Sequence, residues 1–177
     1  MTATLARPTM DLFDSWAAAV AEFGGGHIDG AGLNDDAAAD RATCADLVAR
    51  AALYADRAAT LPDDRVPCDF FWILDDGEVA GFIAFRLELN DFLRRVGGHI
   101  GYSVRASRRR RGLASTALGL VLDRARAEGF ERVMLTCDDD NIGSARTIEG
   151  AGGVLQDVID AKDAGHPRLR RYWIPLG

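Results

Sequence analysis

The chain has 177 residues, of which 48% are apolar and 27% charged, and its formal net charge is −6. This length suits one domain with a core of its own, and the composition is that of a soluble globular protein. No apolar run approaches the length of a membrane span, and the negative net charge argues against a general polyanion binder and mildly favours cationic substrates. The first eight residues lack the apolar stretch of a signal peptide, so we expect a cytoplasmic protein.

The three cysteines, Cys44, Cys68 and Cys137, stand far apart in the sequence. Their number is odd and their spacing matches no metal-ligand pattern, so we expect reduced thiols and no metal. Cys137 ends an apolar segment and is expected to be a core residue. A covalent acyl-enzyme on this thiol is a less favoured alternative.

The first 65 residues are predicted to be mostly helical. An apolar stripe predicts a helix over Asp11–Phe23, which a run of three glycines ends. A second helix is expected from about Asp40 to Ala58. We therefore expect a single domain, residues 1–177, with a helical part over 1–65 and a sheet part over 66–177.

The sheet part begins with strand-like patterns. Phe70–Leu74 is an apolar run, and Val79–Leu89 follows it across a turn that ends at Gly77. Residues 99–105 alternate between apolar and polar, which predicts a half-buried strand. The later elements expected are a strand over Val133–Cys137, a helix over Ile142–Ala151, and a closing hairpin of residues 154–159 and 169–174.

The segment His99–Ala114 carries the strongest functional signal. A strand leads through a basic turn into a helix whose apolar residues begin at Leu113. Unpaired backbone N–H groups at the start of a helix attract anions, and Gly112 lets the backbone approach a ligand closely. Arginines in the turn can pair bidentately with a phosphate. The segment therefore predicts a phosphate-binding site.

Two familiar phosphate motifs do not fit the chain. The single lysine, Lys162, lies far from any glycine pair of a Walker loop. A dinucleotide fingerprint that begins at Gly150 fails because Leu155 stands where the third glycine belongs. A solvated basic turn, or a nucleic-acid patch made with the segment Arg168–Trp173, is an alternative that the acidic net charge disfavours.

The turn Arg109-Arg110-Arg111-Gly112-Leu113-Ala114 resembles the pyrophosphate-binding motif of the GNAT superfamily, the acetyl-CoA-dependent N-acetyltransferases. Asn141-Ile142-Gly143-Ser144 resembles a second motif of that superfamily. The segments Gly97–Arg105, Thr136–Asn141 and Arg171–Ile174 further resemble a bacterial branch of predicted acetyltransferases. The resemblance covers roughly residues 8–175. It implies an α/β (α+β) fold with a mixed, mostly antiparallel central sheet, a splayed parallel strand pair, and flanking helices.

The resemblance also implies where acetyl-CoA, the acyl donor, would bind. Its pantetheine arm would enter between the splayed strands and pair with the backbone of residues 103–106. The amide near Tyr102 would polarise the thioester carbonyl as an oxyanion-hole donor. The cofactor-binding residues expected are Ser103, Val104, Arg105, Arg109, Arg110, Arg111, Gly112, Leu113, Ala114, Ser115, Asn141 and Ser144.

A general base is expected at His99, on the polar face of the predicted strand, because histidine titrates in the useful range. The two preceding glycines are expected to leave room for an acceptor. Glu88 and Asp91 compete for the role of base, and a hydrogen-bonded core histidine is the other interpretation of His99.

The general acid needs a different source than in many superfamily members. The tyrosine that those enzymes carry maps onto Ile148 in this chain. Protonation of the coenzyme A thiolate would then come from Tyr102, Ser144, Cys137 or water. The expected catalytic set is His99, Tyr102 and Glu88.

The function expected is transfer of an acetyl group from acetyl-CoA to a primary amine of a small molecule or peptide, by direct attack in a ternary complex. The alternative is a non-catalytic acyl-CoA-binding or regulatory module on the same fold, which the replacement at Ile148 keeps open. Neither a nucleic acid nor a membrane is expected as a partner, and a homodimer stays open.

Overall fold

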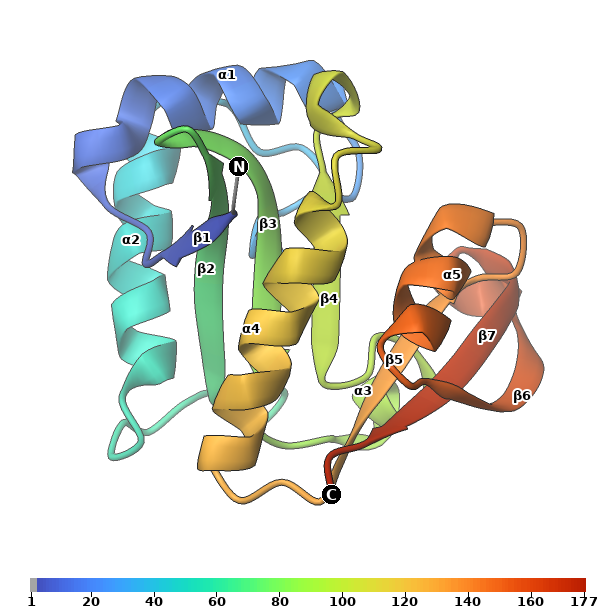
Figure 1. Ribbon diagram of the computed structural model, residues 1–177. Coiled ribbons are helices and arrows are strands. Elements are labelled where there is room, and N and C mark those ends of the chain that lie inside the picture. Colours follow the sequence, from blue (N-terminus) through green and yellow to red (C-terminus); the bar gives the residue numbers. More distant parts are fainter. Residues whose placement is uncertain (1–2) are drawn as a thin grey trace.

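A seven-stranded sheet runs through the computed structural model, which describes residues 3–177 (Figure 1). The first two residues of the predicted domain lie outside the described residues. The sheet has the order β1-β2-β3-β4-β5-β7-β6, and every neighbouring pair is antiparallel except β4 and β5. The predicted mixed sheet with one parallel pair is confirmed. The strands are β1 (Thr4–Ala6), β2 (Cys68–Asp75), β3 (Glu78–Arg86), β4 (Ile100–Val104), β5 (Arg132–Asp138), β6 (Val154–Ala161) and β7 (His166–Pro175).

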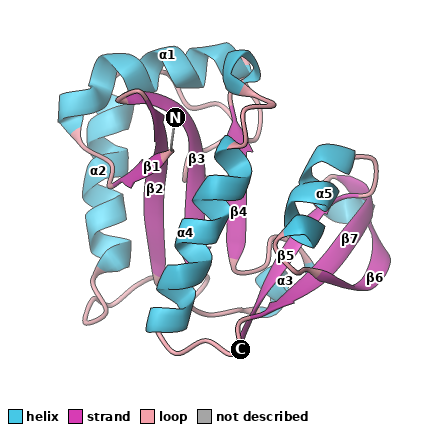
Figure 2. Cartoon of the chain, in the orientation of Figure 1, coloured by secondary structure: helices cyan, strands magenta, loops and turns pink. Residues whose placement is uncertain are grey.

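The longer helices follow the predicted pattern, and Figure 2 shows them around the sheet. They are α1 (Phe13–Phe23), α2 (Arg41–Ala55), α3 (Asp91–Arg95), α4 (Leu113–Ala127) and α5 (Ile142–Gly150), with short 3₁₀ turns at Met10–Leu12, Ala106–Arg108 and Lys162–Ala164. Two elements were not predicted. β1 adds a strand to the segment assigned to the helical part, and α3 lies between the two predicted strands Val79–Leu89 and 99–105. Both are too short to show a period.

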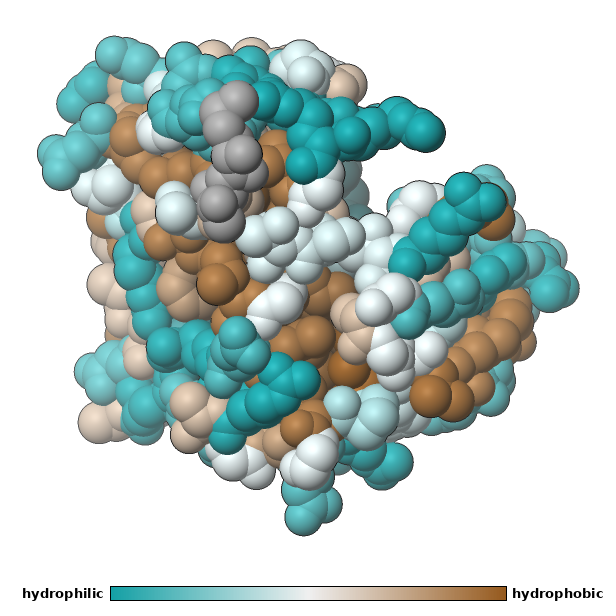
Figure 3. Space-filling model, in the orientation of Figure 1, coloured by the Kyte–Doolittle hydropathy of each residue, from teal (hydrophilic) through white to brown (hydrophobic). Residues whose placement is uncertain are grey.

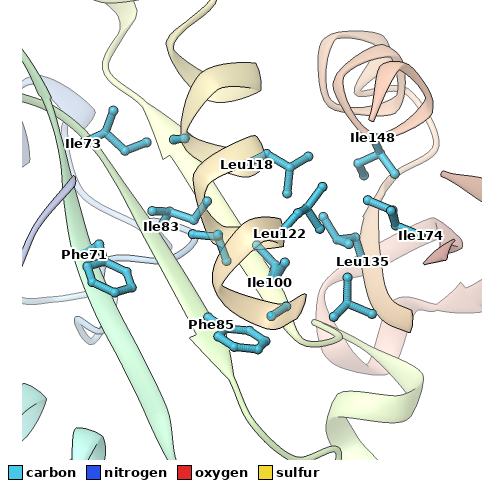
Figure 4. Packing of buried hydrophobic residues seen from close by; sticks show 14 of the residues in the cluster. Phe71, Ile73, Ile83, Phe85, Ile100, Leu118, Leu122, Leu135, Ile148 and Ile174 are labelled. Atoms are coloured by element: carbon cyan, nitrogen blue, oxygen red, sulfur yellow. The ribbon is translucent and has the colours of Figure 1, made fainter. Parts of the chain in front are cut away.

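The two faces of the sheet hold separate cores. Phe71 and Ile73 of β2 point to the face covered by α4 and α5, where they join Leu118, Leu122 and Ile148 (Figure 4). The intervening Trp72 points to the opposite face, and it packs there with α1 and α2. Each such fully buried side chain contributes roughly 1.5–3 kcal/mol to folding.

A buried carboxylate links the sheet to several of the surrounding elements. The side chain of Asp69 on β2 is fully inaccessible. It accepts hydrogen bonds from Arg7 (2.9 Å), from Arg57 after α2 (3.1 Å), and from Arg124 on α4 (2.6 Å). A buried carboxylate needs such partners because removing it from water is costly.

The parallel strands β4 and β5 touch only at one end. Their register holds a single pair, Ile100 with Leu135, and Gly98 forms an isolated bridge to the same leucine. A Cβ on Gly98 would lie 2.4 Å from the carbonyl oxygen of Met134, and the φ of Gly98 is +62°. The glycine before His99 therefore allows close packing on β5. The expectation that the two glycines before His99 leave room for an acceptor stays a prediction.

Candidate active site

A gap opens between β4 and β5 beyond their single pair. The N–H of Arg105 donates to the carbonyl of Ala80 on β3 (2.9 Å). Because main-chain groups alternate along an antiparallel strand, the N–H and C=O groups of Tyr102 and Val104 point away from β3, into the gap. Figure 3 shows a notch in the surface between the part that holds α4 and the part that holds α5. The amide of Tyr102 thus faces the place where an oxyanion donor is expected.

The turn before α4 presents a row of backbone donors beside this gap. Among the described residues, the N–H groups of residues 110–115 have no hydrogen-bond acceptor. Gly112 adopts φ +76° as the residue before the helix, and no atom lies within 4 Å of where its Cβ would stand. The row therefore opens to solvent at the positive end of the helix dipole, which is the geometry that binds phosphate.

The arginines of this turn have different partners. Arg108 and Arg111 both donate to the buried carboxylate of Asp75, at 2.8 and 2.7 Å. These ion pairs fix the turn to the end of β2. Arg110 is exposed, with φ +60°, and its side chain has no partner among the described residues. Arg110 is therefore the arginine in this turn with the most freedom to reach a phosphate.

Two further arginines brace the end of β4. Arg105 donates to Glu22 of α1 (2.6 Å). Arg109 donates through Nε to the carbonyl of Val104 (2.9 Å), so this carbonyl has a partner while the N–H of Val104 still faces the gap. The expected roles of Arg105 and Arg109 in binding the cofactor stay predictions.

The side chain of Tyr102 crosses from β4 to α5. Its hydroxyl lies 2.9 Å from the hydroxyl of Ser144, and the N–H of Ser144 donates to Oδ1 of Asn141, the residue that caps α5 (3.1 Å). Burial raises the pKa of Tyr102 to about 12. The structure thus brings Tyr102, Asn141 and Ser144 together on one side of the gap. Ile148, one turn further along α5, is fully buried in the core.

All three cysteines are free and buried. Burial raises the pKa of Cys137 to about 11, so its thiol stays protonated at neutral pH. This agrees with the expected core role and opposes a nucleophilic one.

His99 lies in different surroundings from those expected. It precedes β4, and only 7% of it is exposed, so the expectation of a polar, open face is wrong. Its Nδ1 accepts the N–H of Met134 (2.8 Å), and its ring packs edge-on against Phe130. Burial lowers the pKa of His99 to about 4, and the charges of Arg94 and Arg86 act in the same direction. The hydrogen bond occupies the lone pair that a base would use, so the geometry gives the predicted role no support.

The competing carboxylates do not converge on the gap. Glu88 is exposed in the loop after β3, and Asp91 is the exposed first residue of α3. Neither lines the cavity described next. Their role as base stays a prediction.

A cavity of about 300 Å³ lies on the face of the sheet opposite α4. It is bounded by the loop between α1 and α2, by α2, by the segment that leads into β2, by the end of β3, and by α3. The loop is held on β4 by Ser103, whose hydroxyl donates to the carbonyl of Asp29 (2.7 Å). A Cβ on Gly30 would lie 2.4 Å from the carbonyl oxygen of Gly101, so the loop rests directly on β4.

Sequence reasoning missed this cavity. Its walls come from five stretches of the chain, and tertiary contacts alone bring them together. No cluster of three or more histidine, cysteine or acidic side chains suited to a metal ion occurs in residues 3–177. In the same part of the chain, no helix has the length and apolarity needed to cross a membrane.

Comparison with known proteins identifies the family. Residues 38–152 match the model of the acetyltransferase (GNAT) family. The chain belongs to the GNAT acetyltransferase family. The matched range runs from before α2 to just after α5, so it includes the gap and the turn before α4. The loop that closes the cavity lies before it. No curated protein matches the chain significantly.

Several solved GNAT structures share the fold. The microcin C7 self-immunity acetyltransferase MccE, solved with acetyl-CoA and AMP, has 14% identity and a TM-score of 0.71 over 98% of this chain and 92% of that one. RimJ of Mycobacterium smegmatis, solved with a coenzyme A disulfide, has 19% identity and a TM-score of 0.72 over 98% and 81%. A Salmonella typhimurium acetyltransferase that modifies the N-terminal serine of ribosomal protein L7/L12 has 16% identity and a TM-score of 0.71 over 99% and 95%. At these identities the likeness establishes the fold.

Proposed function

We propose that this GNAT-family protein transfers the acetyl group of acetyl-CoA directly to a primary amine in a ternary complex. The observation that carries the proposal is the gap between β4 and β5, which has the free amide of Tyr102 on its wall and the unpaired N–H groups of residues 110–115 at its mouth. This combination offers donors for a pyrophosphate and, further in, a donor for a thioester carbonyl. Crystal structures of MccE and RimJ with acetyl-CoA or a coenzyme A disulfide support the choice of donor.

Different residues along the gap bind different parts of acetyl-CoA. The N–H groups of residues 110–115 and the side chain of Arg110 bind the pyrophosphate. The N–H of Val104 and the carbonyl of Tyr102 pair with the pantetheine arm. The N–H of Tyr102 donates to the carbonyl oxygen of the thioester and stabilises the negative charge that develops there when the amine attacks.

The proton transfers follow from the side chains that are present. The amine nitrogen forms a bond to the carbonyl carbon, the carbon–sulfur bond breaks, and the thiolate needs a proton. Tyr102 supplies it, because burial keeps its hydroxyl protonated, and a proton from water, relayed through the hydroxyl of Ser144 at 2.9 Å, restores it. Water takes the proton of the amine, because the lone pair of His99 is already engaged.

A non-catalytic module that binds acyl-CoA is the second candidate, since Ile148 offers no hydroxyl from α5. Release of free coenzyme A thiol from acetyl-CoA, measured over a panel of amino acids, polyamines and short peptides, separates the two. We expect amine-dependent release together with calorimetric binding of coenzyme A. Binding without release for every amine would establish the non-catalytic module, and absence of binding would overturn both candidates.

A further inference from the structure

The cavity on the far face of the sheet contains arginines that no carboxylate neutralises. Among the described residues, neither Arg50 of α2 nor Arg86 at the end of β3 has a carboxylate oxygen within 4 Å, although both line the cavity. Ion pairs engage many of the other arginines, as expected in a chain of net charge −6. An unpaired guanidinium in a cavity is a ready partner for an anion.

Main-chain carbonyls hold both guanidinium groups in place. Arg50 donates to the carbonyl of Gly32, and Nη1 of Arg86 donates to the carbonyls of Gly97 (3.2 Å) and Gly98 (3.1 Å). These bonds use one nitrogen of each group and leave the other donors of the fork without a partner. The carbonyls orient the arginines but do not cancel their charge.

The remaining charged groups of the cavity do not offset these arginines. Among the described residues, Asp64 is the one carboxylate on the lining, and its exposed side chain lies 3.7 Å from that of Arg65, which is also exposed and also lines the cavity. His27 also lines the cavity, but Asp29 (3.2 Å) and Asp35 (3.3 Å) both pair with its ring, so it adds no net positive charge. The interior of the cavity is therefore positive in a protein that is negative overall.

This positive interior lies beside the proposed reaction centre. Both terminal nitrogens of Arg86 are 3.6 Å from where a Cβ on Gly101 would stand, and Gly101 precedes Tyr102 in β4. Aromatic side chains form much of the remaining wall: Tyr54 and Phe70 pack at 6.1 Å between ring centroids, and Phe92 of α3 is 62% exposed at the opening. A ligand in the cavity would meet an apolar wall and a cationic floor next to the gap.

We infer that the acceptor is a small amine that also carries a carboxylate, and that Arg50 and Arg86 bind this carboxylate. The inference rests on the proposed acetyl transfer, because it places the amine near the thioester. A volume of about 300 Å³ is at the lower end for ligand pockets, which fits a molecule of amino-acid size. The bound carboxylate orients the acceptor so that its amine reaches the gap from the face opposite α4.

Matched pairs of acceptors test the inference. Initial rates of coenzyme A release are measured for phenylalanine against phenylalaninamide, and for 4-aminobutyrate against 4-aminobutanamide. Each pair keeps the carbon skeleton and replaces the carboxylate by a neutral amide. The replacement also lowers the pKa of the amine, so kcat/KM is compared on the concentration of free amine in each solution. We expect at least one acid to exceed its amide in kcat/KM by about 10- to 100-fold, the range that charge-assisted hydrogen bonds provide.

Substitutions then test whether Arg50 and Arg86 cause the preference for acids over amides. Arg50→Met and Arg86→Met keep most of the length of the side chain and remove its charge, and each is expected to bring the ratio of acid to amide close to one. Arg41→Met is the matched control: Arg41 is an exposed arginine on the same helix as Arg50 and does not line the cavity, so the ratio should stay unchanged. If Arg86→Met fails to fold because its carbonyl partners are lost, Arg50→Met and Arg50→Lys decide the question.

The outcomes separate this inference from the proposed function. Acetylation of amines with equal rates for acids and amides would overturn the carboxylate site and leave acetyl transfer intact. If no amine releases coenzyme A, acetyl transfer fails, and calorimetric titration of the free protein with the same acids and amides decides the carboxylate site by itself. Loss of acid and amide rates in equal proportion in the Arg50 variants would assign a purely structural role to that arginine.

Discussion

At the scale of single residues, the neutral His99 makes folding sensitive to acid. Above pH 6.5 the imidazole is neutral in both the folded and the unfolded chain. Between pH 6.5 and about 4, His99 is protonated in the unfolded chain but stays neutral in the folded chain. The free energy of unfolding therefore falls as the pH falls. The loss reaches up to about 3 kcal/mol and is complete below pH 4, where both states are protonated.

His99→Asn tests this role and the predicted role as base together. The asparagine carbonyl can accept the N–H of Met134, so we expect the variant to fold at pH 7. Urea unfolding at pH 7 and pH 4.5 should show a smaller loss of stability in the variant than in the wild type. The acidic limb of the pH–rate profile should be the same in both proteins. If that limb disappears in the variant, His99 is the base after all.

The hydroxyl of Tyr102 is the residue-scale candidate for the general acid. Tyr102→Phe keeps the main-chain amide that faces the gap and removes only the proton donor, so kcat should fall by about 10²-fold with the KM for acetyl-CoA nearly unchanged. Tyr172→Phe is the control, because it removes a buried hydroxyl bonded to Glu149 (2.8 Å) and should affect stability alone. Equal kcat values for wild type and Tyr102→Phe would mean that Ser144 or water, and not Tyr102, donates the proton.

At the scale of elements, the proposed coenzyme A site depends on the backbone conformation at the start of α4. Gly112→Val introduces strain at φ +76° and places a branched side chain over the free N–H groups. Calorimetry should show coenzyme A binding weakened by about 1.4 kcal/mol or more, which is at least about tenfold. Gly129→Val, at φ +85° after the same helix, carries the same strain away from the gap and should leave affinity unchanged. Equal affinities in the two variants would remove the turn from the binding site.

The start of α5 offers a similar comparison. Asn141→Ala removes the cap bond to the N–H of Ser144 and should cost about 1 kcal/mol of stability. Asp40→Ala removes the corresponding cap of α2, the bond to the N–H of Thr43 (2.8 Å), at a similar cost. We expect only Asn141→Ala to raise the KM for acetyl-CoA. If both leave it unchanged, Asn141 has a structural role alone.

Sequence patterns predicted those features whose conformation depends only on residues nearby in the chain. The alternation around Tyr102 and the glycine at position 112 predicted the strand, the turn and the free N–H groups of α4, because each depends on neighbours in the chain. His99 was misplaced because it lies just outside β4, where alternation no longer determines which way a side chain points. The cavity around Arg86 could not be predicted, since nothing in the sequence indicates which distant segments meet there.

At the scale of the whole molecule, Asp69 connects elements that lie far apart in the sequence. Burial would raise its pKa, but the hydrogen bonds from Arg57 and Arg124 and the charge of Arg7 outweigh burial, so the pKa is lowered. Its contribution to stability is therefore present above the ordinary value of 3.8 and is lost as the pH falls below it.

Asp69→Asn should lower the free energy of unfolding by about 3 kcal/mol at pH 7, because it leaves three arginines facing a neutral amide. In urea unfolding, the difference from wild type should shrink as the pH falls below 3.8. Asp163→Asn is the exposed control: it breaks the pair with Arg95 (2.6 Å), which water and salt screen, and should cost much less stability than Asp69→Asn. A loss in Asp69→Asn as small as in the control would mean that the buried cluster adds little to stability.

With acetyl-CoA at the turn before α4 and the acceptor in the cavity on the face opposite α4, as proposed above, the positions of the two sites have a consequence for kinetic order. Two ligands that reach one gap from opposite faces do not obstruct each other's path. Neither the donor nor the acceptor has to bind first, and either product can leave while the other is still bound. The sequence of binding and release would then follow from relative affinities and concentrations in solution, and access imposes no fixed order.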